Sequence, residues 1–178
     1  MITYKRAGTD GELEQILEIQ SRAIKSNVSD EDRIKEGYIT VPHTFDILKE
    51  MNDASPHILA IDGDTVAGYA LVMLRRFRNK IPVLEPMFES ADALLPMHNY
   101  LAMGQICIDK PYRSQGLFKG LYNFYREELS ATYDCLFTEV ATANTRSLEA
   151  HKAVGFKILK TEVTDGTSWE LINWEWNA

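Results

Sequence analysis

The sequence predicts a single α/β domain whose mixed β-sheet carries helices on both faces. Segments with strand-like alternation are interspersed with segments of helical spacing, in the order βααββ and then βαβαββ. This order combines hairpins, which pair antiparallel, with strand–helix–strand units, which pair parallel. With 178 residues, one domain over 1–178 buries a large share of its surface, whereas two domains would each be small.

The first half of the chain is predicted to contain three strands, with an interrupted helical part after the first. Apolar β-type runs predict strands at 2–4, 57–61 and 66–74. N-capping residues followed by helical spacing predict helices at 10–24, from 29 onward and at 44–51. A turn at 62–64 joins two of the strands as a hairpin. Residues 75–99 carry mixed charges and three prolines, which is typical of a loop with one short helix at most.

The second half alternates strands with helices and ends in a hairpin. Strands are expected at 103–108, 135–140, 156–163 and 169–176. Helices are expected at 116–129 and 144–153, the second closed by Gly155. Trp169, Trp174 and Trp176 lie in the last strand, and this placement favours a packed core or the edge of a homodimer over a platform for stacked bases.

Composition argues against several classes of partner. Lys and Arg number 19 against 26 Asp and Glu, which gives a net charge of −7. The chain therefore lacks the basic surplus that nucleic acid or an anionic membrane requires. Neither a signal peptide nor a membrane-spanning run is apparent in the sequence, which favours a cytoplasmic location.

The cysteines and histidines lack the spacing of a metal site, so no metal is predicted. Cys107 and Cys135 lie in apolar segments, and we expect them to pack as small hydrophobic side chains. His43, His57 and His98 have no partner at ligand spacing.

Residues 110–119 depart from the acidic average of the chain. Lys110, Arg113 and Lys119 contribute positive charge, and no acid interrupts them. The segment runs from a strand end into a helix, where unpaired backbone N–H groups and the helix dipole favour an anion. Gly116 would let a ligand approach the backbone. These features predict a pyrophosphate site, and an ordinary solvated turn is the alternative.

The same loop resembles a motif of the GNAT superfamily of N-acetyltransferases. In that family a strand-end loop of the form Arg/Gln-x-x-Gly-x-Gly/Ala holds the pyrophosphate of acetyl-CoA through backbone amides. Arg113 and Gly116 match the motif. Phe118 stands where the family has Gly or Ala, so its side chain is expected to point away from the pyrophosphate.

A second motif follows the strand at 135–140. Its residues are Asn144, Ser147, His151, Gly155 and Phe156. In the GNAT superfamily this Asn contacts the CoA arm, and a Tyr is common where His151 stands, as the general acid toward the leaving thiolate. An imidazole can carry that role because its pKa lies near neutrality. Packing or a contact with CoA is the alternative for His151.

The resemblance implies a fold and a co-substrate. It implies a mostly antiparallel sheet in which two parallel strands, at 105–108 and 137–140, splay apart to form the acyl-CoA cleft. The pantetheine arm would pair with this edge like an added strand, and an amide there would bind the thioester oxygen. Acetyl-CoA is the implied co-substrate. Its expected contacts are Ile106, Cys107, Ile108, Arg113, Ser114, Gln115, Gly116, Leu117, Phe118, Lys119, Asn144 and Ser147.

The acceptor side has a weaker pattern. Glu139 lies in an apolar strand, where burial would raise its pKa and make it a base for the amine, and an outward-facing charge is the alternative. Tyr38, Phe45 and Tyr100 are candidate acceptor contacts. Packing in the helical layer is the alternative for the first two. The basic residues at 75–80 are interpreted as a solvated turn or as a contact for an acidic group.

Together these observations predict an enzyme that transfers the acetyl group of acetyl-CoA to a primary amine of a small molecule or a protein, by direct attack in a ternary complex. The alternative is a non-catalytic acyl-CoA-binding regulatory module of the same fold, motivated by His151 and Phe118. A plain α/β interaction domain is a third class, and it would bind no acyl-CoA.

Overall fold

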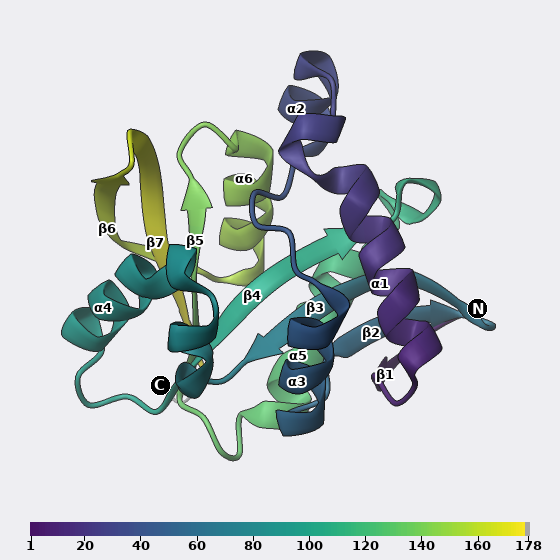
Figure 1. Ribbon diagram of the computed structural model, residues 1–178, viewed down its shortest axis with the longest axis horizontal. Helices are drawn as coiled ribbons and strands as arrows, with labels where there is room; N and C mark the ends of the chain where they lie inside the picture. Colours follow the sequence, from purple (N-terminus) through teal and green to yellow (C-terminus); the bar gives the residue numbers. More distant parts are fainter. Residues whose placement is uncertain (177–178) are drawn as a thin grey trace.

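Seven strands form one β-sheet in the computed structural model, which describes residues 1–176 (Figure 1). The strands are β1 (Ile2–Arg6), β2 (Ile58–Asp62), β3 (Thr65–Met73), β4 (Tyr100–Ile108), β5 (Cys135–Ala141), β6 (Lys157–Thr164) and β7 (Thr167–Glu175). They lie in the order β1-β2-β3-β4-β5-β7-β6. The pair β4–β5 is parallel and every other neighbouring pair is antiparallel. The predicted mixed, mostly antiparallel sheet is confirmed.

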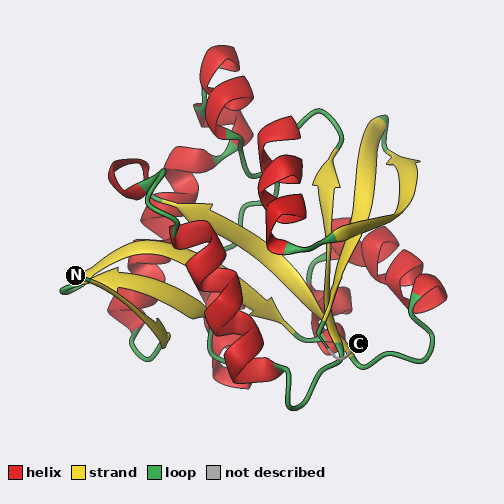
Figure 2. Cartoon of the chain, turned by 180° about the vertical axis from the view of Figure 1, so that it is seen from behind, coloured by secondary structure: helices red, strands yellow, loops and turns green. Residues whose placement is uncertain are grey.

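Helices cover both faces of this sheet, as predicted (Figures 1 and 2). The α-helices are α1 (Asp10–Ala23), α2 (Asp30–Glu36), α3 (Phe45–Ala54), α4 (Glu85–Leu94), α5 (Leu117–Leu129) and α6 (Thr145–Val154). The apolar faces of α1, α3 and α4 pack on one side and those of α5 and α6 on the other. Strand alternation supplies both cores, since Leu59 faces the first cluster while Ile58 and Ala60 face the second.

The helices begin where the sequence places capping residues. The Thr9 hydroxyl accepts a hydrogen bond from the Glu12 backbone N–H, and the Glu12 carboxylate accepts one from the Thr9 backbone N–H, which completes a capping box at the start of α1. The side chains of Thr44 and Asn144 likewise accept from backbone N–H groups in the first turns of α3 and α6. Gly155, at a φ of 126°, ends α6 as predicted.

The parallel pair β4–β5 is short, and this creates the opening in the sheet. Its register runs only from Tyr100 opposite Cys135 to Ala102 opposite Phe137. Just beyond, the Thr138 hydroxyl donates to the Met103 carbonyl oxygen at 3.0 Å. From there to Ile108, β4 lacks a partner on its β5 side among the described residues. The predicted splay of the two strands is therefore present.

Residues 75–99 are more ordered than the prolines suggest. They contain two 3-10 helices, at Arg75–Lys80 and Pro82–Leu84, followed by the ten-residue helix α4. Pro86 sits in the first turn of α4, where a missing N–H costs no hydrogen bond. Strand β4 begins at Tyr100, three residues before the predicted start. In the described part of the chain, every helix is too short or too polar to cross a membrane.

Candidate active site

A cleft open to solvent lies where β4 and β5 diverge. The segment 38–41, both diverging strands and the N-terminal turns of α6 line it, together with three side chains from more distant elements. These three are Leu84, Met87 and Trp169. Because α6 lies on one face of the sheet and α4 on the other, the cleft has one end toward each helical layer.

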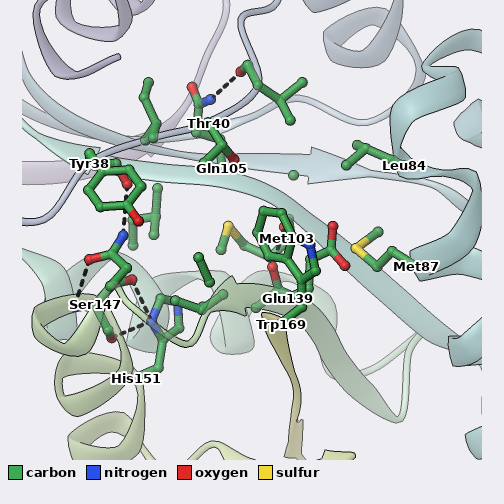
Figure 3. Close-up of a pocket in the computed structure, with 18 residues that line it drawn as sticks. Tyr38, Thr40, Leu84, Met87, Met103, Gln105, Glu139, Ser147, His151 and Trp169 are labelled. Atoms are coloured by element: carbon green, nitrogen blue, oxygen red, sulfur yellow. Dashed lines mark hydrogen bonds between the residues drawn. The ribbon is translucent and has the colours of Figure 1, made fainter. Parts of the chain in front are cut away.

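The close-up shows how the side chains divide between the two ends (Figure 3). Tyr38, Ser147 and His151 gather at the end formed by α6. Leu84 and Met87 lie at the opposite end. Glu139, Met103 and Trp169 lie between these two groups. A molecule reaching in from the α6 side would therefore meet one from the α4 side near Glu139.

Glu139 is the carboxylate of the cleft. It projects from β5 on the same face as Phe137, which packs in the core under α4. Burial, with a smaller contribution from the nearby Glu162 carboxylate, raises the pKa of Glu139 to about 7. Glu162 itself is held by Ser90 of α4 and by Lys160. Glu139 is thus a cleft-facing group of near-neutral pKa, and the outward-facing alternative is not observed.

His151 is almost fully buried, and both of its ring nitrogens are engaged. Its Nδ1 lies 2.7 Å from the Ser147 carbonyl oxygen, so Nδ1 carries the proton and donates. Its Nε2 then accepts from the Tyr122 hydroxyl at 2.7 Å. Burial lowers the pKa of His151 to about 4, so the ring is neutral at physiological pH. This arrangement favours the packing role of His151 over that of a free proton donor.

The segment 37–41 crosses the cleft between β4 and α6. The Asn144 amide donates to the Tyr38 carbonyl oxygen at 3.0 Å. The Gln105 amide donates to the Val41 carbonyl oxygen at 2.8 Å, and its oxygen accepts from the Tyr69 hydroxyl at 2.5 Å. Gly37, at a φ of 76°, passes so close to Asn144 that a Cβ there would lie 3.1 Å from the amide oxygen.

Both predicted CoA-arm neighbours, Asn144 and Ser147, line the cleft.

The loop before α5 has the geometry of an anion site. Ser114 and Gly116 adopt positive φ values of 61° and 83°, and Ser114 is one of two non-glycine residues among 1–176 that do so. Within the described chain, no side chain caps the first turn of α5, so its backbone N–H groups face outward. The Phe118 ring turns inward and meets the rings of Tyr122 and His151 edge-on. Its ring therefore packs between α5 and α6.

Arg113 is already engaged by an acid. Its guanidinium pairs with the Glu36 carboxylate at the end of α2, and Lys110 lies 3.6 Å from the same carboxylate. Arg113 also donates through Nε to the Ile108 carbonyl oxygen at 3.1 Å. Together with Cys107 these groups line a second hollow beside the cleft. A pyrophosphate at this loop would compete with Glu36 for Arg113.

Two of the three predicted acceptor contacts lie outside the cleft. Phe45 packs against the core beneath α1 and α3. Tyr100 is buried at the start of β4, where its hydroxyl donates to Asp92. Tyr38 does line the cleft. Tyr38 thus lies at the α6 end of the cleft, while Phe45 and Tyr100 hold structural positions.

The remaining predicted side chains also have defined places. Arg75 and Arg78 both pair with Asp92 of α4, and Lys80 lies 3.2 Å from Glu50 of α3, so three of the four basic residues at 75–80 are paired with acids. Burial raises the pKa of the Cys107 thiol to about 11 and that of Cys135 to about 12, which matches small packing side chains. No cluster of three His, Cys, Asp or Glu side chains suited to a metal occurs within 1–176.

Sequence reasoning missed Trp169 as a cleft residue. Trp174 packs in the core as expected, but Trp169 pairs opposite Ala141 of β5. Cross-strand neighbours project to the same face, so Trp169 joins the face of Glu139, two residues away from Ala141. The place of Trp169 in the cleft can therefore be derived once the register between β5 and β7 is known. Leu84 and Met87, in the stretch expected to be mainly loop, carried no comparable signal.

The sequence model of the Acetyltransferase (GNAT) family matches residues 14–156. No curated protein sequence matches this chain.

Solved structures resemble this fold over nearly the whole chain. The ribosomal-protein-S18-alanine N-acetyltransferase of Escherichia coli superposes with a TM-score of 0.66 at 16% identity, covering 100% of this chain and 96% of the other. The yncA protein of Salmonella typhimurium, solved with acetyl-CoA, gives 0.69 at 14% identity and covers 100% and 95%. A phosphinothricin acetyltransferase of Sinorhizobium meliloti, also with acetyl-CoA, gives 0.66 at 17% identity and covers 99% and 89%.

Proposed function

The chain belongs to the GNAT family of acetyltransferases, and from that premise we propose that it transfers the acetyl group of acetyl-CoA to a primary amine in a ternary complex. The observation that carries the proposal is the cleft through the sheet, with Glu139 between its α6 end and its α4 end. Such a cleft lets a thioester approach from one helical layer and an amine from the other, so that the reacting atoms meet in line.

Acetyl-CoA would bind along the α5–α6 side of the sheet. The outward-facing N–H groups at the start of α5 would hold the pyrophosphate, with Arg113 adding a charged contact. The pantetheine arm would follow the unpaired edge of β4 as an added strand, near Asn144 and Ser147. A backbone amide of β4 near Ile106 would donate to the thioester oxygen, where negative charge develops.

Glu139 would act as the base. An amine reaches the protein as an ammonium ion, and the Glu139 carboxylate removes one proton from it. The neutral nitrogen then attacks the thioester carbon and leaves a tetrahedral oxyanion and a protonated nitrogen. When the intermediate collapses, the carbon–sulfur bond breaks and the second nitrogen proton passes to the departing sulfur. The products are the N-acetylated amine and CoA, and Glu139 releases its proton to water.

Titration calorimetry with CoA tests the cofactor side of this proposal. The wild-type chain should bind, and combining Gly116→Asp with Asn144→Ala should abolish binding, because the first change places a negative charge in the anion site. Gly166→Asp is the matched control, since Gly166 also has positive φ, at 75°, and open space around it, but lies in the β6–β7 turn. Absence of wild-type binding would reject the proposal.

The second candidate, a non-catalytic acyl-CoA-binding module, shares that binding result. It is motivated by His151, whose one ring proton is occupied by the Ser147 carbonyl. Release of free thiol from acetyl-CoA over a broad panel of amines separates the two functions. An enzyme releases thiol with at least one class of amine, whereas a binding module releases none.

A further inference from the structure

We propose that the acceptor is a small primary amine with an apolar body and no acidic group. This inference rests on the proposed function and narrows it to a substrate class. It is drawn from the charges and side chains at the α4 end of the cleft, where the acceptor would enter.

The first argument is the charge inventory of the cleft. Among the described residues that line it, Glu139 is the one acidic side chain, and neither Lys nor Arg is present. The lining imidazole, His151, is neutral because burial lowers its pKa. An acceptor carboxylate or phosphate would therefore meet a carboxylate and no cation. In a partly dehydrated site such an encounter is strongly unfavourable.

The second argument is that three cations of the neighbouring elements are already paired with acids. Arg75 and Arg78 pair with Asp92 at 2.5 Å each. Lys160 pairs with Glu162 at 2.8 Å. Glu162 is the carboxylate whose charge contributes to the raised pKa of Glu139, so a second negative group stands close by. An acid group of a substrate would compete with Asp92 or Glu162 for these three cations.

The third argument is the apolar surface itself. Leu84, Met87 and Met103 are each at most 5% exposed, and their hydrophobic atoms face the cleft beside the Trp169 ring. An indole face and two thioethers offer dispersion contacts to an aliphatic or aromatic body, and methionine side chains adapt to its shape. Each buried methylene of such an acceptor contributes favourably to binding.

Matched amine pairs test this inference. Phenethylamine and phenylalanine share an aromatic body and a primary amine and differ by one carboxylate, as pentylamine and norleucine do. With acetyl-CoA and thiol release as the readout, we expect kcat/KM for each amine to exceed that of its amino acid by about 100-fold, the order expected for repulsion between carboxylates in a protein site. Ethanolamine, which lacks the apolar body, should fall below pentylamine by at least about tenfold.

A charge-reversal variant sharpens the test. Thr40 is exposed and lines the cleft, so Thr40→Arg adds a cation there without burying a new charge. Thr40→Arg should raise the ratio of phenylalanine to phenethylamine turnover by about tenfold or more. Thr40→Gln, which adds length without charge, should leave that ratio within about twofold. An equal response of both variants would count against charge as the cause.

The outcomes separate this inference from the proposed function. Equal or faster turnover of the amino acids would overturn the inference and leave acetyl transfer intact. Turnover of neither phenethylamine nor pentylamine by a chain that binds acetyl-CoA would also overturn it. Failure to bind acetyl-CoA would instead reject the proposed function.

Discussion

Glu139 shows how a single position in a strand sets the chemistry of the cleft. Its neighbours in β5, Thr138 and Val140, project to the opposite face, where Val140 packs beneath α5 and α6. Glu139 therefore faces the α4 layer, half buried and beside Glu162. Burial makes its ionised form costly, which brings the pKa close to the range where it both accepts and releases a proton readily.

The first prediction at this scale concerns pH. Because the base must be ionised, activity should rise with pH through the Glu139 pKa of about 7. Glu139→Gln should lower kcat by about 10²–10⁴-fold and remove this acidic limb of the profile. Steady-state kinetics from pH 5.5 to 9 checks both effects, with CoA binding measured alongside.

Glu162→Gln is the companion variant. Removing the neighbouring charge should lower the Glu139 pKa and move the acidic limb to lower pH while activity at pH 8 is retained. A limb that persists in Glu139→Gln would show that another group titrates.

At the residue scale, the sequence predicted several of the residues that line the cleft, but it did not always predict the contacts that their side chains make. The two motifs placed Asn144, Ser147 and Ile106 at the cleft, because motif spacing fixes where strand ends meet helix starts. The surroundings of His151 depend on Tyr122, which is 29 residues earlier and reaches it across two packed helices. Nothing local in the sequence specifies such a contact.

Helix α2 and the segment after it connect two parts of the candidate site. Glu36, the last residue of α2, forms an ion pair with Arg113. In the segment that follows, the Tyr38 carbonyl oxygen accepts from Asn144, and the Val41 carbonyl oxygen accepts from Gln105. The Glu36 carboxylate therefore contacts the loop before α5, and the backbone of the segment after α2 contacts the cleft residues.

The prediction for this element is that Glu36→Gln tightens acetyl-CoA binding. The pyrophosphate and the Glu36 carboxylate are both anions that seek Arg113, so loss of the acid leaves the guanidinium free for the cofactor. We expect a fewfold to about tenfold lower Kd by calorimetry at low salt, with a smaller gain at high salt.

Glu31→Gln is the control in the same helix, since Glu31 pairs with Lys35 at the surface. If Glu36→Gln weakens binding, Glu36 orders Arg113 for the cofactor and does not compete with it.

Prediction of the elements succeeded where periodicity is strong. The hairpins, the helix α5 and the capped helices α1, α3 and α6 follow from local pattern and capping residues. Helix α4 was harder to predict because Pro82 and Pro86 suggest a loop. Both prolines instead occupy first-turn positions, of a 3-10 helix and of α4, where proline is tolerated.

At the scale of the molecule, three buried imidazoles link stability to pH. Burial lowers the pKa of His43 to about 4, of His57 to about 3 and of His151 to about 4. His57 is fixed between the Val72 amide, which donates to Nδ1, and the Leu48 carbonyl oxygen, which accepts from Nε2. A proton on Nδ1 would break the first of these hydrogen bonds.

The prediction is a loss of stability as pH falls from about 6.5 toward 4. In that window the unfolded chain binds protons on these histidines while the folded chain does not, so each contributes up to about 1.4 kcal/mol per pH unit. Glu139 acts in the opposite sense, because its raised pKa makes the folded state the better proton binder between about 4.5 and 7. Because three histidines oppose one glutamate, the free energy of unfolding should fall on balance as the pH is lowered.

Urea unfolding at pH 7.5, 6 and 5 measures this dependence. His57→Gln should reduce the slope, because the His57 pKa is lowered to about 3 by burial. A free energy of unfolding that stays constant over this range would contradict the linkage.

The order of strands in the whole sheet could be anticipated only in part from the sequence. The family resemblance implied which two strands splay, and the hairpins fixed the local pairs. The pairing of β7 between β5 and β6 joins residues far apart in sequence, such as Phe137 in β5 and Asn173 in β7, which are 36 positions apart. Such non-local pairing depends on the assembled core and not on local pattern.

The short register between β4 and β5 has a consequence for the energetics of the empty protein. Three residue pairs and the Thr138–Met103 hydrogen bond are the seam that joins a four-stranded half-sheet to a three-stranded one. A cofactor arm lying along β4 would supply the missing rungs of the ladder, so part of the tertiary structure would be contributed by the substrate. Exchange at those amides of 103–108 that do not donate to β3 should then be fast in the free protein and slow with CoA, as the two half-sheets become one cooperative unit.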